Sequence, residues 1–492
     1  MRCLLLLAAL FTYGYCYQGG GWNQNSRFDL TRALVEQHRT QITKYADNSG
    51  DLALRGPTVY CDKAPGVSLL ALPWFAAWHA VHGPVRDNAD RRLDAAAYLV
   101  TVGAVALPAA IFIVVLFELL AVFGLDERVR LALCGSYAWA TLAWPFATML
   151  YGHQVTAALG ASGFLLLVKL RYRSADHHVG RADQPARSAG TLLTVGALLS
   201  CAVVCDYTAG LLIPVLAIYA ATFVRPWPRL AWVVVGAVLP AVALGYYHYC
   251  AFGSPLTLPY EFSNQPPRSQ GWFMGIGVPK PYAFWHLTVL PYRGLFFSAP
   301  WLLAALPAAV LARRLRFRAE RIVAFTIFAL FMWMNTSLVD WRAGWTFGPR
   351  YLVPAIPFLV IAIAASWAGI ERTWQTLTPR ARRVVVGITV AALAWSFIHI
   401  LIATAVNPQV GMDIRAPWSD YYWPHAWAGH FASSTQSITA DRAGSAPVAW
   451  NLGQRLGLHG WLSLAPLFAV QLLTVAAALR LRRPQPAAIA TT

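Results

Sequence analysis

Long apolar segments dominate this sequence and limit what the chain can fold into. Of its 492 residues, 58% are hydrophobic and 12% are charged, and the mean hydropathy is +0.48. A soluble domain carries about 25% charged residues, whereas a helix that crosses a bilayer core needs about 20 predominantly apolar residues. The sequence therefore predicts an all-α polytopic membrane protein.

Thirteen apolar segments are candidate helices. They lie at 3–17, 67–82, 96–123, 131–149, 154–168, 190–204, 207–224, 230–249, 295–312, 322–336, 351–369, 384–404 and 460–479. Segment 67–82 is short and contains Pro73, so the charges of the loops must decide whether it crosses. If it does not, the loops on the N-terminal side beyond residue 123 hold 21 Lys and Arg residues, and the opposite loops hold 8. Since cytoplasmic loops are enriched in Lys and Arg, we expect about twelve transmembrane helices, cytoplasmic termini and an interfacial helix at 67–82.

This topology makes three long loops external, at 18–95, 250–294 and 405–458. The first contains a helix-like run at 26–38 and a polar segment at 48–66. The Ala- and Arg-rich composition is typical of a bacterium. We therefore expect an inner-membrane protein whose long loops face the periplasm.

Composition also argues against several classes of function. The net charge is +18, but the basic residues are spread over short loops, which fits membrane topology better than nucleic-acid binding. Seven Cys residues, mostly in or beside apolar segments, do not form a disulfide framework. The first apolar segment lacks a small-x-small cleavage site, so we expect an uncleaved span rather than a signal peptide.

Carboxylates gather in the loop 18–95. Asp29 lies in the helix-like run, and Asp51 and Asp62 lie in the polar segment beside the next apolar helix. Clustered carboxylates shift each other's pKa and can act as general bases or metal ligands. Asp29 beside Arg27 also fits an ordinary surface ion pair.

Cations and aromatic residues suggest where an anionic ligand would bind. Lys63 directly follows Asp62 and can hold a lipid phosphate or act as an interfacial lysine. Arg350, followed by Tyr351, can bind a phosphate through two hydrogen bonds, although Trp345 nearby also fits an interfacial anchor. Arg293 is placed similarly in a second Pro- and aromatic-rich segment.

Further candidates lie near the ends of spans. His153 at the outer end of one span is a ligand, a proton carrier or a capping residue. Asp206 ends another span, where an ionisable group is a functional candidate. Tyr60 and Tyr351 can stack on sugar rings, or can belong to the interfacial belt of aromatic residues.

Two segments carry a resemblance to a known family. YCDKAPGVSLLALP (60–73) and WRAGWTFGPRYLVPAIPF (341–358) resemble motifs of GT-C membrane glycosyltransferases, such as protein O-mannosyltransferases and lipid A aminoarabinose transferases. The resemblance covers roughly residues 1–370. It implies a polyprenyl-phosphate-linked sugar donor whose phosphate contacts Lys63 and Arg350, with Asp62 shaping the acceptor or metal side.

The sequence departs from the family pattern at two places. The family commonly starts its first external loop with an Asp-Glu pair before an Arg, whereas this chain has Gln24, Asn25 and Ser26 before Arg27. Asp29 or Asp51 must then supply the base. His153 stands where family members often place an acid. Residues 405–458 match nothing in the family.

The resemblance implies an inverting hexosyl- or pentosyltransferase that acts on a glycan, lipid or protein acceptor at the external face. We expect a catalytic module at 1–370 that includes the loop 18–95, and C-terminal helices at 371–492 with the loop 405–458. No cofactor is certain, and the need for a divalent metal stays open. The alternatives are a transporter or flippase of a lipid-linked saccharide, and a non-catalytic scaffold with the same fold.

Overall fold

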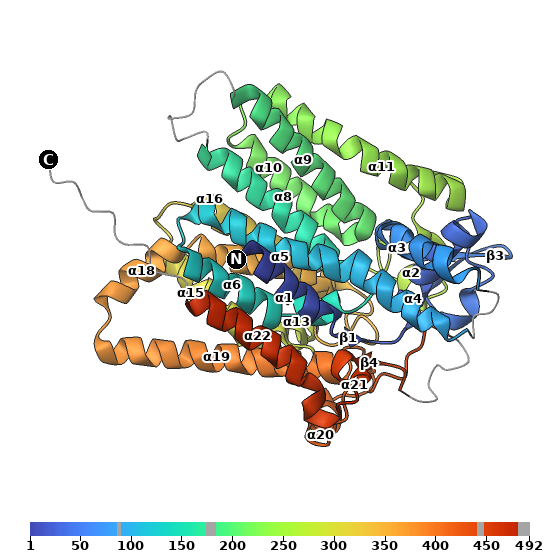
Figure 1. The fold of residues 1–492 in the computed structure, drawn as a ribbon. Helices are drawn as coiled ribbons and strands as arrows, with labels where there is room; N and C mark the ends of the chain where they lie inside the picture. The colour runs from blue at the N-terminus through green and yellow to red at the C-terminus, as the bar shows by residue number, and fades with distance from the viewer. Residues whose placement is uncertain (86–89, 174–183, 440–446, 481–492) are drawn as a thin grey trace.

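The computed structural model describes residues 1–85, 90–173, 184–439 and 447–480. Residues 86–89 of the loop 18–95 and 440–446 of the loop 405–458 lie outside the described residues. Arg181, Arg482 and Arg483, which belong to the basic loop residues counted above, also lie outside the described residues. Within the described residues the chain is mainly helical, with two small antiparallel sheets of two strands each (Figure 1).

The N-terminal part alternates helices with short strands. Its elements are α1 (Arg2–Gly14), β1 (Cys16–Tyr17), α2 (Trp22–Arg32), β2 (Leu52–Arg55), β3 (Thr58–Cys61) and α3 (Gly66–His82). The predicted helix-like run is confirmed, because α2 continues as a π-helix at Ala33–Gln37. The predicted interfacial helix is α3, which packs on α2 through Phe75 and Phe28, whose ring centroids lie 5.5 Å apart.

Long helices make up the middle of the chain. They are α4 (Arg92–Thr101), α5 (Leu107–Leu119), α6 (Glu127–Trp139), α7 (Ala143–Ala147), α8 (His153–Arg173), α9 (Gln184–Cys205), α10 (Leu212–Ala221) and α11 (Ala231–Phe252). A π-helical turn at Val102–Ala106 joins α4 to α5.

The C-terminal part mixes short helices with further long ones. They are α12 (Pro266–Ser269), α13 (Pro281–Thr288), α14 (Leu295–Ser298), α15 (Ala305–Leu311), α16 (Arg318–Ser337), α17 (Ile356–Ala364), α18 (Trp367–Thr376), α19 (Pro379–Val406), α20 (Trp423–Trp427), β4 (Trp450–Asn451), α21 (Leu452–Arg455) and α22 (Ala465–Leu479).

Length and composition allow six described helices to cross a membrane. They are Arg92–Phe123, His153–Tyr172, Ser188–Cys205, Trp227–Phe252, Pro379–Val406 and Gly460–Leu479. A helix pair bent by 47°, Arg350–Ala364 with Trp367–Thr376, makes a seventh if it is one span. The described residues thus have an all-α polytopic architecture, but they do not confirm the expected number of about twelve spans.

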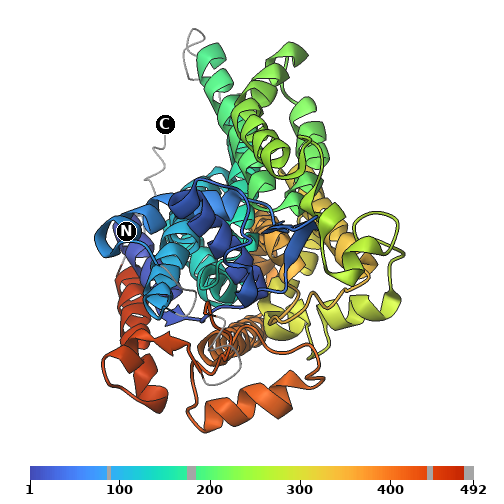
Figure 2. The same cartoon turned by 90° about the vertical axis from the view of Figure 1, so that its right-hand side faces the viewer.

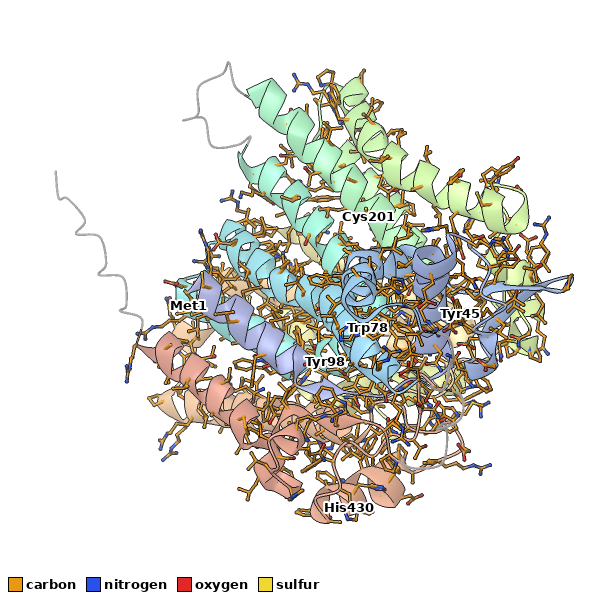
Figure 3. All side chains as sticks on the ribbon, turned by 45° about the vertical axis from the view of Figure 1, so that its right-hand side comes forward. Met1, Tyr45, Trp78, Tyr98, Cys201 and His430 are labelled. Carbon is orange, nitrogen blue, oxygen red and sulfur yellow. The ribbon has the colours of Figure 1, made fainter. Side chains whose placement is uncertain are left out.

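The helices form one bundle with a layer on its side. Helices α8 to α11 lie together at the top of Figure 1 and rise above the other helices in Figure 2. The apolar side chains of α11 project outward in Figure 3, and Leu239 is 78% exposed. A helix so apolar and so little covered by protein is suited to lie against lipid tails.

The predicted external loops meet at one end of the bundle. In Figure 1, α2, α3 and β3 lie at the right, and β1, β4, α20 and α21 lie at the lower right. Strand β1 pairs with β4, with Cys16 opposite Asn451 and Tyr17 opposite Trp450. The loop 405–458 is therefore attached to the N-terminal part, while the boundary at residue 370 stays a prediction.

Helices α9 and α11 approach closely because a glycine of each helix faces the backbone of the other helix. A Cβ added at Gly196 would lie 1.9 Å from the Val233 carbonyl oxygen, whereas one at Gly190 in the same helix would meet open space. We expect Gly196→Val to lower the free energy of unfolding by about 1–3 kcal/mol, the usual range for overpacking. Thermal unfolding in nanodiscs measures this loss. Equal melting temperatures for Gly196→Val and the control Gly190→Val would contradict it.

Candidate active site

The β2–β3 hairpin places two acidic residues opposite each other. Leu52 pairs with Cys61 and Arg55 pairs with Thr58, and the positive φ of Gly56 suits the tight turn between them. The residues just outside the paired ends are Asp51 and Asp62. Continuing the register brings their side chains together at the open end of the hairpin.

Lys63 joins these two carboxylates. Its Nζ lies 2.9 Å from an oxygen of Asp51 and 2.9 Å from an oxygen of Asp62. Asp62 is fully buried, whereas the Asp51 side chain is 17% exposed. Since a buried charge is tolerated when it is paired, we infer that Asp62 positions Lys63 and that Asp51 is the carboxylate that a ligand can reach.

The hairpin is held by contacts with the end of α11. Ala53 and Cys61 pack in a core cluster with Ala251 and Phe252, and Arg55 donates to the Ala251 carbonyl at 3.1 Å. Burial raises the pKa of the Cys61 thiol to about 11, so this residue is a neutral neighbour of the charged group. These contacts fix the open end of the hairpin relative to the helices.

Tyr60 belongs to this packing. Its ring centroid lies 5.4 Å from that of Phe252. The residue is half-buried, and it is not among the described residues that line the cavity discussed next. Its predicted contact with a sugar has no support in this arrangement.

A cavity of about 610 Å³ lies beside the Lys63 group. Its wall includes predicted site residues from distant parts of the sequence: Asp51, Lys63, Arg350 and Tyr351. The remaining wall comes mainly from the start of α2 and the segment 338–345. Long-range folding therefore brings the two sequence motifs to one cavity.

Arg350 is a buried cation with few protein partners. It begins a 3₁₀ helix at Arg350–Ala355 and donates to the Tyr351 hydroxyl at 3.4 Å. Its guanidinium lies 5.6 Å from the ring centroid of Tyr151. The Nε atom is buried and has no hydrogen-bond partner among the described residues. An incompletely paired, buried guanidinium at a cavity wall is suited to bind an anion.

His153 and Asp206 form a pair behind Tyr351. His153 Nδ1 lies 2.6 Å from an Asp206 oxygen, and the ring centroids of His153 and Tyr351 lie 5.4 Å apart. Burial alone would raise the pKa of Asp206, but His153 and the hydrogen bonds from Thr208 lower it to about 2. The ionised Asp206 therefore orients His153, which supports the cavity wall through Tyr351.

Arg293 lies behind the cavity rather than in its wall. It donates to the carbonyl oxygens of Gly344, at 2.9 Å, and of Thr346. The side chain is buried. Its predicted role in binding phosphate thus has no geometric support, and we infer that it positions the segment 344–346.

Asp29 is also separate from the cavity. It lies fully buried in α2, where Oδ1 accepts a hydrogen bond from Asn48 at 3.3 Å. Burial raises the pKa of Asp29 well above its usual value, and nearby Arg32 offsets this only in part. The geometry therefore favours Asp51 over Asp29 as the base.

The residues at the place of the family's Asp-Glu pair form a network of amides. Asn25 Nδ2 donates to the carbonyl oxygens of Asn48, at 2.7 Å, and Ser437, at 2.8 Å. Gln24 donates to the Gly20 carbonyl and accepts from the Leu150 backbone N–H. An aspartate at position 25 could not donate these bonds, so the local structure requires an amide here.

The cavity wall also contains residues that the sequence did not single out. Asp340 accepts from the Gly344 backbone N–H at 3.2 Å and lies 3.5 Å from Arg342. Asp340 and Arg342 both line the cavity. Ala343 and Gly344 both have a positive φ, which shapes this turn. The Ala-Gly pair is the sequence feature that could have indicated the turn. Gln265 and Gln436, also in the wall, had no such signal.

The acidic residues do not form a recognisable metal site. Among the described residues, no group of three or more His, Cys, Asp or Glu side chains could hold a metal ion. The ammonium group of Lys63 lies between Asp51 and Asp62 and contacts an oxygen of each. A divalent cation at this place would need these same carboxylate oxygens as ligands. The residues in this place therefore fit a lysine rather than a metal ion.

Asn25→Asp tests the amide network. The variant carboxylate would face two carbonyl oxygens, so we expect a loss of about 1–3 kcal/mol of folding free energy. Asn264→Asp is the control, because Asn264 uses its oxygen to accept from Leu52 N, which a carboxylate can also do. Melting temperatures that fall equally in both variants would show that the donor role of Asn25 is not required.

Asp29→Asn tests the burial of that carboxyl group. Because the folded state raises its pKa, ionisation costs the folded protein stability once the pH exceeds about 4, the usual pKa of Asp. The wild type should therefore lose stability relative to the variant as pH rises from 4 toward neutrality. Thermal unfolding across this range measures the difference, and a difference that does not change with pH would contradict the burial effect.

Comparison with known proteins gives matches in structure alone. No model of a protein family matches this sequence, and no curated protein matches it. The structure is similar to that of ArnT, an aminoarabinose transferase from Cupriavidus metallidurans, bound to undecaprenyl phosphate. The TM-score is 0.53 at 16% sequence identity, over 97% of this chain and 74% of ArnT.

Archaeal oligosaccharyltransferases are also similar. The enzyme from Archaeoglobus fulgidus tethered with an acceptor peptide gives a TM-score of 0.52 at 12% identity. AglB from the same organism, in complex with an inhibitory peptide and a dolichol-phosphate, gives 0.51 at 13% identity. In both comparisons 87% of this chain is matched to 57% of the other. The chain thus has the GT-C fold, and the resemblance noted in its sequence is confirmed at the level of the fold.

Proposed function

We propose that this protein is a membrane glycosyltransferase that moves a sugar from a polyprenyl phosphate to an acceptor hydroxyl. The observation that carries this proposal is the single cavity that joins Asp51 and Lys63 to Arg350. The fold supports it, because structural neighbours were solved with undecaprenyl phosphate and dolichol-phosphate.

The donor phosphate would bind between Lys63 and Arg350. Both cations line the cavity, and the buried Arg350 Nε has no protein partner among the described residues. When the bond between the anomeric carbon and the phosphate oxygen breaks, the leaving phosphate gains negative charge. Fixed cations next to the leaving oxygen stabilise that charge.

Asp51 would act as the general base. It takes the proton of the acceptor hydroxyl while the hydroxyl oxygen forms the new bond to the anomeric carbon. The products are the glycosylated acceptor and polyprenyl phosphate, and Asp51 later loses its proton to solvent. A single displacement inverts the anomeric configuration.

The orientation in the membrane is part of the proposal. The predicted external loops that build the cavity would face the periplasm of a bacterial inner membrane, with about twelve spans and both termini in the cytoplasm. The apolar helix surfaces would hold the lipid tail while the sugar-phosphate enters the cavity. The sugar would be a hexose or pentose, and the acceptor a glycan, lipid or protein.

The bent helix pair favours a second candidate, a transporter of lipid-linked saccharide. Transporters use interrupted helices near the middle of the membrane, and the break between α17 and α18 is bent by 47°. However, Arg350 begins the 3₁₀ helix before α17 and is therefore far in sequence from the bend. A non-catalytic scaffold would have no need of a cavity that presents an accessible carboxylate together with two cations, Lys63 and Arg350.

Release of polyprenyl phosphate tests the proposal. Purified protein in nanodiscs is given undecaprenyl-phosphate-linked mannose, glucose, galactose or arabinose with a crude envelope acceptor fraction. We expect release with one donor, and a decrease of at least about 100-fold in Asp51→Asn, the usual contribution of a general base. Arg350→Lys should lower the rate by a similar factor, because lysine cannot form the paired hydrogen bonds of a guanidinium.

Two further carboxylates provide the controls. Asp29→Asn should release product at a rate close to the wild type, since Asp29 lies outside the cavity. Asp340→Asn tests whether the other carboxylate of the cavity wall takes part in the chemistry. Full activity in Asp51→Asn with loss in Asp340→Asn would move the base to Asp340. Donor movement across the bilayer without release, in wild type, would favour the transporter.

A further inference from the structure

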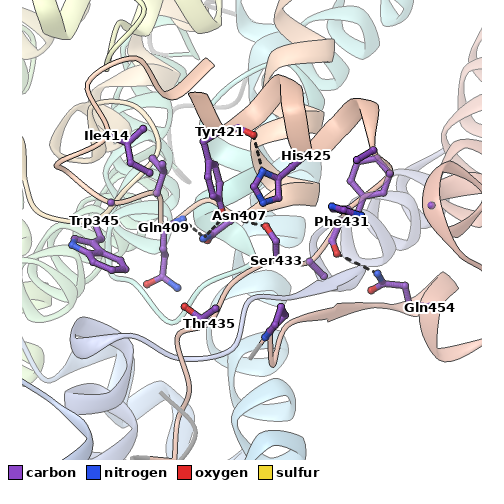
Figure 4. A pocket seen from close by; sticks show the side chains of 18 of the residues that line it. Trp345, Asn407, Gln409, Ile414, Tyr421, His425, Phe431, Ser433, Thr435 and Gln454 are labelled. Carbon is purple, nitrogen blue, oxygen red and sulfur yellow. Dashed lines mark hydrogen bonds between the residues drawn. The ribbon is translucent and has the colours of Figure 1, made fainter. Parts of the chain in front are cut away.

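A second cavity lies next to the first and is formed mainly by described residues of the segments 407–435 and 447–460. Its volume is about 910 Å³. Trp345 and Gln409 line both cavities, so the two meet at these side chains. Figure 4 shows the second cavity, with Trp345 and Gln409 at one side and Gln454 at the other.

Hydrogen bonds hold this cavity against the catalytic part of the protein. Gln409 Nε2 donates to the Gly20 carbonyl at 2.7 Å, and Asn25 donates to the Ser437 carbonyl at 2.8 Å. Asn48 donates to the Ile438 carbonyl at 2.8 Å. The segment is thus fixed at the start of α2, which also contributes to the first cavity.

The cavity wall is ordered by its own polar contacts. The Tyr421 hydroxyl lies 3.2 Å from Asn407 Nδ2 and 3.0 Å from Ser433 Oγ. Gln454 Nε2 donates to the Phe431 carbonyl at 3.3 Å (Figure 4). Bonds of this kind fix the shape of a binding surface before a ligand arrives.

The charges of the two cavities differ. Lys63, Arg342 and Arg350 line the first cavity. In the part of the chain that the structure describes, the wall of the second contains Asp413 but neither Lys nor Arg. Its other polar side chains carry amides, hydroxyls and imidazoles. Such a wall suits a neutral ligand with many hydroxyl groups and disfavours a phosphorylated or acidic one.

Trp345 is placed to contact a sugar at the junction of the cavities. Its side chain is 47% exposed, and Arg293 holds the neighbouring Gly344 and Thr346 carbonyl oxygens. An indole is a large apolar surface with low conformational freedom. It can therefore cover the apolar face of a sugar ring while amides bind the hydroxyls.

We propose that the second cavity binds a neutral glycan acceptor, whose terminal sugar reaches Asp51 past Trp345. This inference rests on the proposed glycosyltransferase function and names its acceptor class. The acceptor hydroxyl loses its proton to Asp51, as described above, and the remaining sugars of the acceptor occupy the second cavity.

The test separates acceptors by charge. Envelope polysaccharide is partly hydrolysed and divided by anion exchange into a neutral and an acidic oligosaccharide fraction. The full chain in nanodiscs receives each fraction with radiolabelled undecaprenyl-phosphate-linked sugars, and binding of each fraction without donor is measured by microscale thermophoresis. We expect binding and labelling of the neutral fraction.

A blocking variant and a matched control locate the site. Ala428 is an exposed residue of the cavity wall, so Ala428→Trp would fill space that the acceptor needs. We expect its binding of the neutral fraction to fall at least about tenfold, equivalent to about 1.4 kcal/mol. Ala416 is exposed in the same loop but is not among the described residues of this wall, so Ala416→Trp should bind as the wild type does.

Each outcome separates this inference from the proposed function. Preferential labelling of the acidic fraction, or unchanged binding by Ala428→Trp, would overturn the neutral-glycan site while leaving the transferase intact. Binding of the neutral fraction that Ala428→Trp abolishes, without release of undecaprenyl phosphate from any donor, would support the glycan site and overturn the transferase.

Discussion

The ion pairs of Lys63 with Asp51 and Asp62 are the interaction on which the candidate site depends. Removing two carboxylates and an ammonium from water costs several kcal/mol for each ion, which only close pairing can offset. The hairpin register supplies that pairing, and the contacts of the hairpin with α11 hold it in place. Without Lys63, two neighbouring carboxylates would repel each other, and the fully buried Asp62 would lose this ion pair.

The departure at residues 24–26 and the unmatched loop 405–458 have a common explanation. Asn25 donates to the Ser437 carbonyl of this loop, so an amide at the place of the family's acid attaches the loop to α2. The attached loop builds the second cavity. The change from acid to amide is therefore a structural requirement of this chain, and the accessible carboxylate lies instead at Asp51.

The sequence predicted the helices better than the site. Apolar segments form helices through local hydrogen bonds and lipid contact, so the helices at 67–82 and 384–404 could be predicted directly. The strands β2 and β3 are only four residues long, and nothing local indicated that Asp51 would face Asp62. Asp29, Tyr60 and Arg293 were plausible by residue type, but burial and packing decide their roles. Those depend on contacts between distant segments.

Arg350 and Lys63 were predictable for a different reason. Charged residues next to long apolar segments are costly unless they have a ligand or a partner, and motif resemblance pointed to the same positions. Arg342 lies in the same motif as Arg350, and Asp340 directly precedes that motif. Both were missed, because their place in the cavity depends on the turn at Ala343 and Gly344. No sequence pattern predicted the second cavity, since its wall combines Trp345 with residues that lie more than 60 positions later in the chain.

The most direct test of the account is a cryo-electron microscopy structure of the full chain in nanodiscs with undecaprenyl phosphate. We expect phosphate density in the first cavity, within hydrogen-bond distance of both Lys63 and Arg350, and the loss of this density in a matched Arg350→Lys sample. Phosphate density elsewhere on the protein, with the contacts of both cations unchanged, would contradict it.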